Sequence, residues 1–598
     1  MTSPSPGQVD APDDLRLLRA FEPVVRLTQG EYFVPVSVDE YVRRCSLWTQ
    51  GPDGVLAKVA DPGALDLALL AQWGAALDGP GQSLSAVSVQ ASRWQRIKGW
   101  RRTVRPTFRA GNRLAEVGLF ARVIDTLSRL SLLIRGAVPG GSALASLEMQ
   151  QEHLRPDVPA YHGRVVRYGG YIVCQYWYFY AFNNWRSGFS GVNEHEADWE
   201  QVTVYLDGIG PVDEHGLPYA RWVVFSAHDE TGDDLRRRWD DPDLMLVEGR
   251  HPVVFAGAGS HSGAYLAGDY LITVVPPRLG GIVPALRRAA KVLTPWTRAA
   301  QGSGLGIPYI DYARGDGLGI GPGQAVSWSP VLIDDETPWV RDYRGLWGHD
   351  TRDRLGGERG PAGPRYERDA TVRASWGDPV GWAGLAKVAP NREAELELVA
   401  QRLGEIDAEL VVLDESAEGG RHDLAARAAG LPPGAPEVRA LEAEERRVSG
   451  ARLASVRLRD ERERMVRALR DGISSPDPHA HLRHRRTPLA SSDRGRAKLL
   501  SAWAIISTPL ILLLVASLIL PASWSRISAA VLMLLVVLAV EAFARGFLLA
   551  YLWRALLVIA IANLVVAFLR NWQFALAGLL AGTALVVLIV NVRDARRG

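Results

Sequence analysis

One short stretch of the sequence gathers several side chains that can hold a metal ion. Residues 191–200 read Gly-Val-Asn-Glu-His-Glu-Ala-Asp-Trp-Glu and lead into a β-branched, aromatic run at 199–206. Side chains two apart on a strand share a face, so Asp198 and Glu200 are expected to project together, with His195 folding back from the preceding turn. This set suits a divalent cation, with Mg, Ca or Mn favoured and Zn possible. The alternative is a solvated acidic turn.

Two further histidines follow predicted strands and extend the candidate metal site. His228 comes after the run at 221–225, and His261 lies in a Gly- and Ser-rich stretch after the run at 252–255. Strand ends can meet at one rim, so these histidines and Glu196 form an additional candidate set. A lone histidine is more often structural than a ligand, so separate structural roles are the competing interpretation.

The sequence lacks the motifs of nucleotide-driven and serine-hydrolase chemistry. It contains no G-x-x-x-x-G-K-[ST] phosphate loop and no G-x-S-x-G elbow, so Ser260 and Ser262 are interpreted as turn residues. The charge is nearly balanced, with 68 Lys and Arg against 66 Asp and Glu, so no global field indicates nucleic acid as a partner. The two cysteines cannot form a disulfide framework, and they suit a reducing compartment.

The C-terminal part of the sequence, 499–592, is hydrophobic over lengths that can cross a bilayer. Its apolar runs predict about four transmembrane helices, at 499–520, 527–549, 555–569 and 574–592. Basic residues flank the first and last runs, which places both flanks on the cytoplasmic side. The first thirty residues do not resemble a secretory signal. We therefore predict a multi-pass protein of the cell membrane, with the lipid bilayer as a partner and a cytoplasmic N-terminal region.

Two charges interrupt the second apolar run. Glu541 and Arg545 are spaced i to i+4 with the acid first, so they are expected to pair on one helix face. Charges inside a membrane favour a functional role. The alternative is that the second span ends early and leaves Arg545 at the membrane interface.

A helical stalk and a linker are predicted before the membrane helices. Residues 391–470 are typical of a helical hairpin or coiled coil, which would act as a spacer or join a protein partner or a second copy of the chain. Its apolar side chains recur three and four apart, at Leu396, Val399, Leu403, Ile406, Leu410 and Leu413. Residues 471–498 are interpreted as a flexible basic linker that could touch anionic lipid.

The sequence pattern of residues 1–390 is typical of a mainly-β sandwich. Short β-branched or aromatic runs alternate with turn residues, and the strongest of these runs lie at 171–182, 199–206, 221–225 and 252–255. Two basic amphipathic segments, near 95–135 and 282–300, are predicted as helical inserts that pack on the sandwich or lie in the membrane interface. The chain as a whole is therefore expected to be multidomain.

The stretch His-Glu-Ala-Asp-Trp-Glu at 195–200 resembles the H-x-x-D-W-E signature of the vacuolar protein sorting-associated protein 62 family. Other segments are similar to further blocks of that family, at 21–25, 30–38, 176–180, 226–228, 251–261 and 343–348. The signature is also similar to that of necrosis- and ethylene-inducing-like cytolysins, whose β-sandwich holds a divalent cation. By that resemblance His195, Asp198 and Glu200 would be the cation ligands. The stalk and anchor depart from both families, so toxin activity does not carry over.

Three functions compete at this point. The first is a membrane-anchored, divalent-cation-binding β-sandwich protein that binds a membrane component or a protein partner on the cytoplasmic side, in trafficking or envelope organisation. The second is a metal-dependent hydrolase of an ester or phosphoester, in which Glu196, His228 or His261 moves the proton. The third is a transporter with a regulatory cytoplasmic domain.

Overall fold

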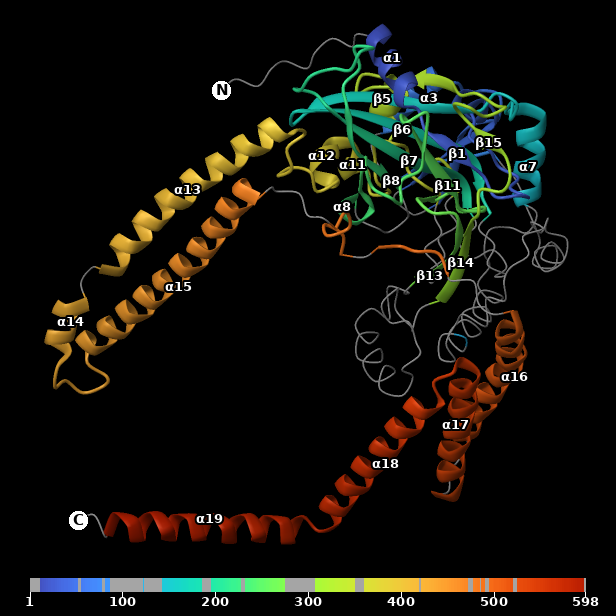
Figure 1. Cartoon of the computed structure of the whole chain (residues 1–598). Helices are drawn as coiled ribbons and strands as arrows, with labels where there is room; N and C mark the ends of the chain where they lie inside the picture. The colour runs from blue at the N-terminus through green and yellow to red at the C-terminus, as the bar shows by residue number, and fades with distance from the viewer. Residues whose placement is uncertain are drawn as a thin grey trace.

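The computed structural model of the chain contains several sheets, a projecting pair of helices and a C-terminal series of apolar helices (Figure 1). Described are residues 11–51, 55–77, 81–86, 122, 142–184, 195–226, 232–274, 307–349, 360–418, 421–471, 477–483, 485–489, 494–519 and 524–595. His228 and the predicted insert at 282–300 lie outside these residues. So does the insert near 95–135, with the exception of Arg122.

A six-stranded sheet lies at the centre of the globular region, in the order β16-β5-β6-β7-β8-β9. Its strands are β5 (Ala160–Tyr168), β6 (Tyr171–Asn183), β7 (His195–Asp207), β8 (Ala220–Phe225), β9 (Arg237–Arg238) and β16 (Ser329–Leu332). Neighbours from β5 to β9 are antiparallel, whereas β16 runs parallel to β5. The strands predicted at 171–182, 199–206 and 221–225 are confirmed as parts of β6, β7 and β8.

A second sheet joins parts of the chain that are far apart in sequence. It contains β10 (Leu246–Val247), β11 (His251–Ala256), β12 (Gly263–Ala264), β1 (Val24–Arg26) and β15 (Gly319–Ile320). The parallel pairing of β1 with β11 sets Val24 beside Val253. The strand predicted at 252–255 is thus confirmed inside this sheet.

Smaller sheets and short helices complete the globular region. β2 (Ser46–Gln50), β3 (Leu56–Ala60) and β4 (Gln82–Ser85) form one small sheet, and β13 (Gly268–Val274) pairs with β14 (Ile307–Ala313). The helices are α1 (Ala11–Phe21), α2 (Val38–Arg44), α3 (Leu67–Leu77), α7 (Ser142–His153), α8 (Gly232–Leu235), α10 (Pro338–Asp342), α11 (Ala374–Gly377) and α12 (Pro379–Trp382).

The two larger sheets contribute to one hydrophobic core. Val25 and Val254 of the second sheet belong to the same buried cluster as Phe179 and Trp199 of the six-stranded sheet. Aromatic rings pack at its centre, with the ring of Trp199 5.4 Å from the ring of Trp347. The beginning of β7, where the H-x-x-D-W-E signature lies, is therefore held inside a packed core.

Two long helices project from the sheets as an antiparallel pair (Figure 1). They are α13 (Arg392–Glu418) and α15 (Pro436–Asp471), with α14 (Arg421–Ala428) at the far end. Ion pairs join them, including Arg402 with Glu461 at 3.2 Å and Asp407 with Arg462 at 2.7 Å. The predicted helices of the stalk are confirmed, and Ile406 of the predicted seam is fully buried.

The C-terminal helices are α16 (Arg494–Ile519), α17 (Trp524–Arg545), α18 (Leu548–Arg570) and α19 (Trp572–Ala595). In the described part of the chain, three segments are long and apolar enough to cross a membrane: Ser528–Arg545, Leu548–Arg570 and Trp572–Arg593. α16 contributes the shorter apolar stretch Ala502–Leu514. These helices indicate association with a membrane. α16 and α17 pack together, whereas α18 and α19 extend away from them with exposed apolar side chains (Figure 1).

Candidate functional site

The signature at 195–200 forms the first half of β7 and pairs with the end of β6. Asp198 lies opposite Tyr180, and His195 lies opposite Asn183. Ala197 has a φ of 62°, which is the left-handed region that L-residues rarely adopt. This local reversal interrupts the alternation of side chains along β7, so residues two apart in the signature contact different neighbours.

Glu196 is the residue that this reversal directs elsewhere. Its carboxylate accepts hydrogen bonds from the backbone N–H of Ala86, from Ser85 Oγ at 3.1 Å and from the backbone N–H of His349 at 3.1 Å. These partners belong to β4 and to the segment after α10. The structure thus does not bring Glu196 to the partners of Asp198.

Asp198 and His261 meet in the interior, as the sequence suggested for His261. His261 Nδ1 lies 2.9 Å from Asp198 Oδ2, and the His261 ring stacks on Tyr180 with centroids 3.7 Å apart. Glu31 lies on the other side of the ring, with its Oε1 3.8 Å from His261 Nε2. The imidazole of His261 is thereby enclosed between two carboxylates and completely buried.

The two carboxylates set the charge of His261. Burial disfavours the imidazolium, but the contacts with Asp198 and Glu31 outweigh it and raise the pKa of His261 to about 9. Burial would also raise the pKa of Glu31, yet His261 and the backbone N–H groups of Phe33 and Gly259 lower it. At neutral pH this part of the site is an imidazolium between two carboxylates.

Glu200 and Asp311 add two more buried acids. Glu200 accepts a hydrogen bond from Ser226 Oγ at 2.6 Å. Asp311 accepts hydrogen bonds from the hydroxyls of Ser260 and Ser262, which flank His261 in sequence. Burial raises the pKa of Glu200 well above its usual range, and the negative charge of Asp198 raises it further. An ionised Glu200 therefore needs a positive partner here.

His195 is buried at the start of β7, and its tautomer follows from its neighbour. Its Nδ1 lies 2.6 Å from the carbonyl oxygen of Ala197, and a carbonyl only accepts, so Nδ1 carries the proton. A neutral His195 therefore has its lone pair on Nε2. His195, Asp198 and Glu200 do not have three ligand atoms close together; within the described ranges such a group occurs at Asp241, Asp243 and His479.

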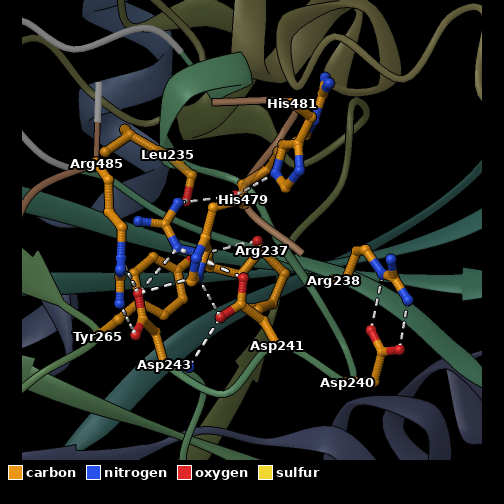
Figure 2. Close-up of polar contacts among 12 residues, drawn as sticks. Leu235, Arg237, Arg238, Asp240, Asp241, Asp243, Tyr265, His479, His481 and Arg485 are labelled. Atoms are coloured by element: carbon orange, nitrogen blue, oxygen red, sulfur yellow. Dashed lines mark hydrogen bonds and ion pairs between the residues drawn. The ribbon is translucent and has the colours of Figure 1, made fainter. Parts of the chain in front are cut away.

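Figure 2 shows this second cluster, where the segment before the membrane helices meets the globular region. His479 Nε2 lies 3.0 Å from Asp241 Oδ1 and 3.3 Å from Asp243 Oδ2. Arg485 Nε donates to Asp243 Oδ2 at 2.8 Å. The Nε of the buried Arg237 is farther away, 3.9 Å from Asp241 Oδ2 and 4.0 Å from Asp243 Oδ2. The charges of two arginines already balance those of the two aspartates, so the cluster is an ion-paired contact between the segment of His479 and Arg485 and the globular region.

These ion pairs belong to the segment 471–498, which the sequence predicted to be a flexible linker. His481 packs edge-on against Trp222 at 5.3 Å, and the backbone N–H of Arg483 donates to Asp234 at 2.7 Å. Further along, the backbone N–H of Leu489 donates to Asp269 at 2.8 Å. The described residues between 477 and 489 therefore lie against the globular region.

The predicted pair inside the apolar helices is confirmed and has an unexpected third member. Arg545 Nε donates to Glu541 at 2.8 Å. Arg122, 419 positions earlier, also donates to Glu541 at 2.8 Å, and to Ser507 of α16 at 3.0 Å. Trp503 donates to the same carboxylate at 2.7 Å. Arg122 and Glu541 are 1% and 0% exposed, so the Arg122 side chain is buried between α16 and α17.

No known protein family, curated protein or solved structure matches this chain. The similarity to the vacuolar protein sorting-associated protein 62 family therefore stays a resemblance of motifs. The main site residues that sequence reasoning missed are Glu31, Asp311 and Arg122. Each acts through a partner far away in sequence, so no local spacing indicates it.

Proposed function

We propose that the protein is a membrane-anchored protein whose globular region, arranged as a β-sandwich, binds a divalent cation. In this proposal the globular region lies on the cytoplasmic side and binds a membrane component or a protein partner, in trafficking or envelope organisation. The anchor is supported by three apolar helices of membrane length. The sandwich is supported by the core that the two larger sheets share.

One observation carries the proposal of a cation. Four carboxylate side chains, from Glu31, Asp198, Glu200 and Asp311, are buried around His261. His261 pairs with two of them, Asp198 at 2.9 Å and Glu31 at 3.8 Å. Buried carboxylates are stable when they are paired, protonated or bound to a metal ion. Four carboxylates gathered around one imidazole favour a divalent cation as a further partner.

The donor set fits a hard or borderline divalent ion. Asp198 and Glu200 offer carboxylate oxygens, which suit Mg, Ca or Mn. His195 offers Nε2, and its Nδ1–H bond to the Ala197 carbonyl is the kind of contact that orients a ligand histidine. Bound there, a divalent ion would supply positive charge to the acids and fix the beginning of β7. A hydrolase that uses Glu196 as its base gains no support, because Glu196 contacts Ser85, Ala86 and His349.

The test uses the full-length chain, purified in detergent and stripped with a chelator. We would add Mg, Ca, Mn or Zn singly and measure bound metal and the melting temperature. The wild type is expected to bind about one added ion, and its free energy of unfolding should rise by about 2.7 kcal/mol when the ion is at 100 times its Kd. The double variant Asp198→Asn, Glu200→Gln should lose both responses.

A surface variant serves as the matched control. Asp240→Asn removes an acid that pairs with Arg238 and is 66% exposed, so metal content should be unchanged. A wild type that binds no ion and melts at the same temperature with each metal would disprove the cation site. The buried acids would then be held by protonation of Glu200.

A further inference from the structure

The juxtamembrane segment, which comprises the described residues 477–483 and 485–489, reaches the hairpin of β13 and β14. Figure 1 shows this segment, in orange, running from the region of α8 to these two strands. The backbone N–H of Leu489 donates to the backbone carbonyl oxygen of Asp269 on β13 at 2.8 Å. α16 begins at Arg494, five positions after Leu489, so the contact lies close to the start of the apolar helices.

The side chain of Leu489 packs against a small buried cluster of the globular region. The cluster contains Ala258, from the turn after β11, and Ile310 and Tyr312 of β14. The turn and the strand are also joined directly, because the backbone N–H of Ala258 donates to the carbonyl oxygen of Tyr312 at 3.1 Å. The juxtamembrane segment therefore contacts the same two elements that contribute to the buried acidic group around His261.

β14 contributes to that group through Asp311. Side chains alternate along a strand, so Asp311 lies on the opposite face of β14 from the two neighbours that pack with Leu489. The contacts agree, because Asp311 accepts hydrogen bonds from Ser260 Oγ at 2.7 Å and from Ser262 Oγ at 2.6 Å, on either side of His261. One strand thus has the juxtamembrane segment on one face and the buried acids on the other.

We propose that binding of a divalent cation at the buried acids and docking of the juxtamembrane segment stabilise each other through β14. The inference rests on the proposed cation site. A cation offsets the repulsion among the acids around His261, which holds Asp311 and β14 in place and forms the surface on which Leu489 packs. Docking in turn fixes β14 from its other face and keeps Asp311 beside the site. The cation thereby sets how firmly the globular region is held at the start of the membrane helices.

Thermodynamic linkage makes the proposal quantitative, because each event must change the equilibrium constant of the other by the same factor. The variant Leu489→Ser removes the apolar side chain that packs on β14. In the full-length chain in detergent, titrated with Mg, Ca, Mn or Zn singly, it should bind the ion about tenfold more weakly than the wild type, within the roughly 5–150-fold range of coupled sites. Leu403→Ser, at a partly buried leucine of α13 in the stalk, is the matched control and should keep the wild-type Kd.

Hydrogen exchange measures the other half of the coupling and needs no change in the segment itself. The amide of Leu489 is protected by its bond to Asp269 when the segment is docked. Saturating metal should slow exchange of peptides from the juxtamembrane segment in the wild type by the same factor, about tenfold. In the double variant Asp198→Asn, Glu200→Gln, the same metal should leave the exchange rate unchanged.

The outcomes separate this coupling from the cation site on which it rests. A wild type that binds none of the four metals overturns both. A wild type that binds an ion as tightly as Leu489→Ser does overturns the coupling alone, and the cation site stands. Exchange of the juxtamembrane segment that is equally fast with and without bound metal in the wild type also overturns the coupling, whether or not Leu489→Ser folds.

Discussion

Two buried groups of charged residues in this protein differ in their ratio of acidic to basic side chains. Around His261, four carboxylates are buried with one imidazolium in contact with two of them. Around Glu541, two arginines share a single carboxylate, which also accepts a hydrogen bond from Trp503. In the first group the acids described outnumber the base at the centre, and in the second the bases outnumber the acid. The same residue types are thus arranged in opposite ways in the two places.

The positions of the partners reinforce this difference. The acids around His261 come from the sheets and the segments between them, so they surround a point inside the globular region. The donors to Glu541 come from Arg122, from α16 and from α17 itself. Glu541 thereby connects the N-terminal half of the chain to the apolar helices. Substituting one residue of each group should show which group holds distant parts of the chain together.

The largest effect is expected from Glu541→Ala. The change leaves the buried Arg122 without its carboxylate, and breaking a buried pair in this way costs about 3–5 kcal/mol. Thermal unfolding of the full-length protein in detergent would measure the loss. Glu397→Ala, at an exposed position of α13, should leave the melting temperature unchanged. If the two variants melt at the same temperature, the Glu541 ion pairs do not stabilise the fold, and the contrast between the two buried groups fails.

The next effect is a pH dependence that belongs to the His261 group. The pKa of His261 is about 9 in the folded protein against 6.5 for the free side chain. Because the folded pKa is raised, the stabilisation is complete below pH 6.5 and is lost as the pH rises through 9. The loss amounts to about 3 kcal/mol.

Metal-free wild type and His261→Gln would be unfolded thermally across that range. The wild type should lose stability relative to the variant as the pH rises, because Gln has no proton to release. The raised pKa of Glu200 acts in the same direction and is present in both proteins. Parallel stability curves for the two proteins would show that His261 carries no shifted charge.

The smallest effect concerns the backbone that shapes the candidate metal site. Ala197, with a φ of 62°, and Ala181 of β6 are both fully buried, and Ala181 is not among the described residues with positive φ. Changing either to Gly removes one methyl group and adds the same freedom to the unfolded chain. Only Ala197→Gly relieves a left-handed residue, so it should be less destabilising than Ala181→Gly by about 1 kcal/mol. Equal melting temperatures would mean that the reversal at Ala197 is unstrained.

Features with a local cause could be predicted from the sequence. The strands β6, β7 and β8 follow from β-branched and aromatic runs, and the stalk helices follow from apolar spacing. The pair of Glu541 with Arg545 follows from one turn of a helix. In each case the residues that interact are close in sequence, so the local sequence is sufficient to predict the structure.

Partners chosen by the topology could not be predicted. Glu31 reaches His261 because β1 pairs with β11 and brings the N-terminal segment beside that strand. Glu196 and Asp198 were both assigned to the candidate site, yet the conformation of Ala197 separates them. His479 looked like part of a flexible basic linker, and its contacts with Asp241 and Asp243 depend on where the fold places those acids.

The contact between Arg122 and Glu541 also sets an order of events during synthesis. The two residues are 419 positions apart, and ribosomes add about 5–20 residues per second, so Arg122 waits roughly 20–80 seconds for its carboxylate. During that interval the Arg122 side chain cannot occupy its final place between α16 and α17. The sheets have time to form first, and the joining of the two halves of the chain is a late step of assembly.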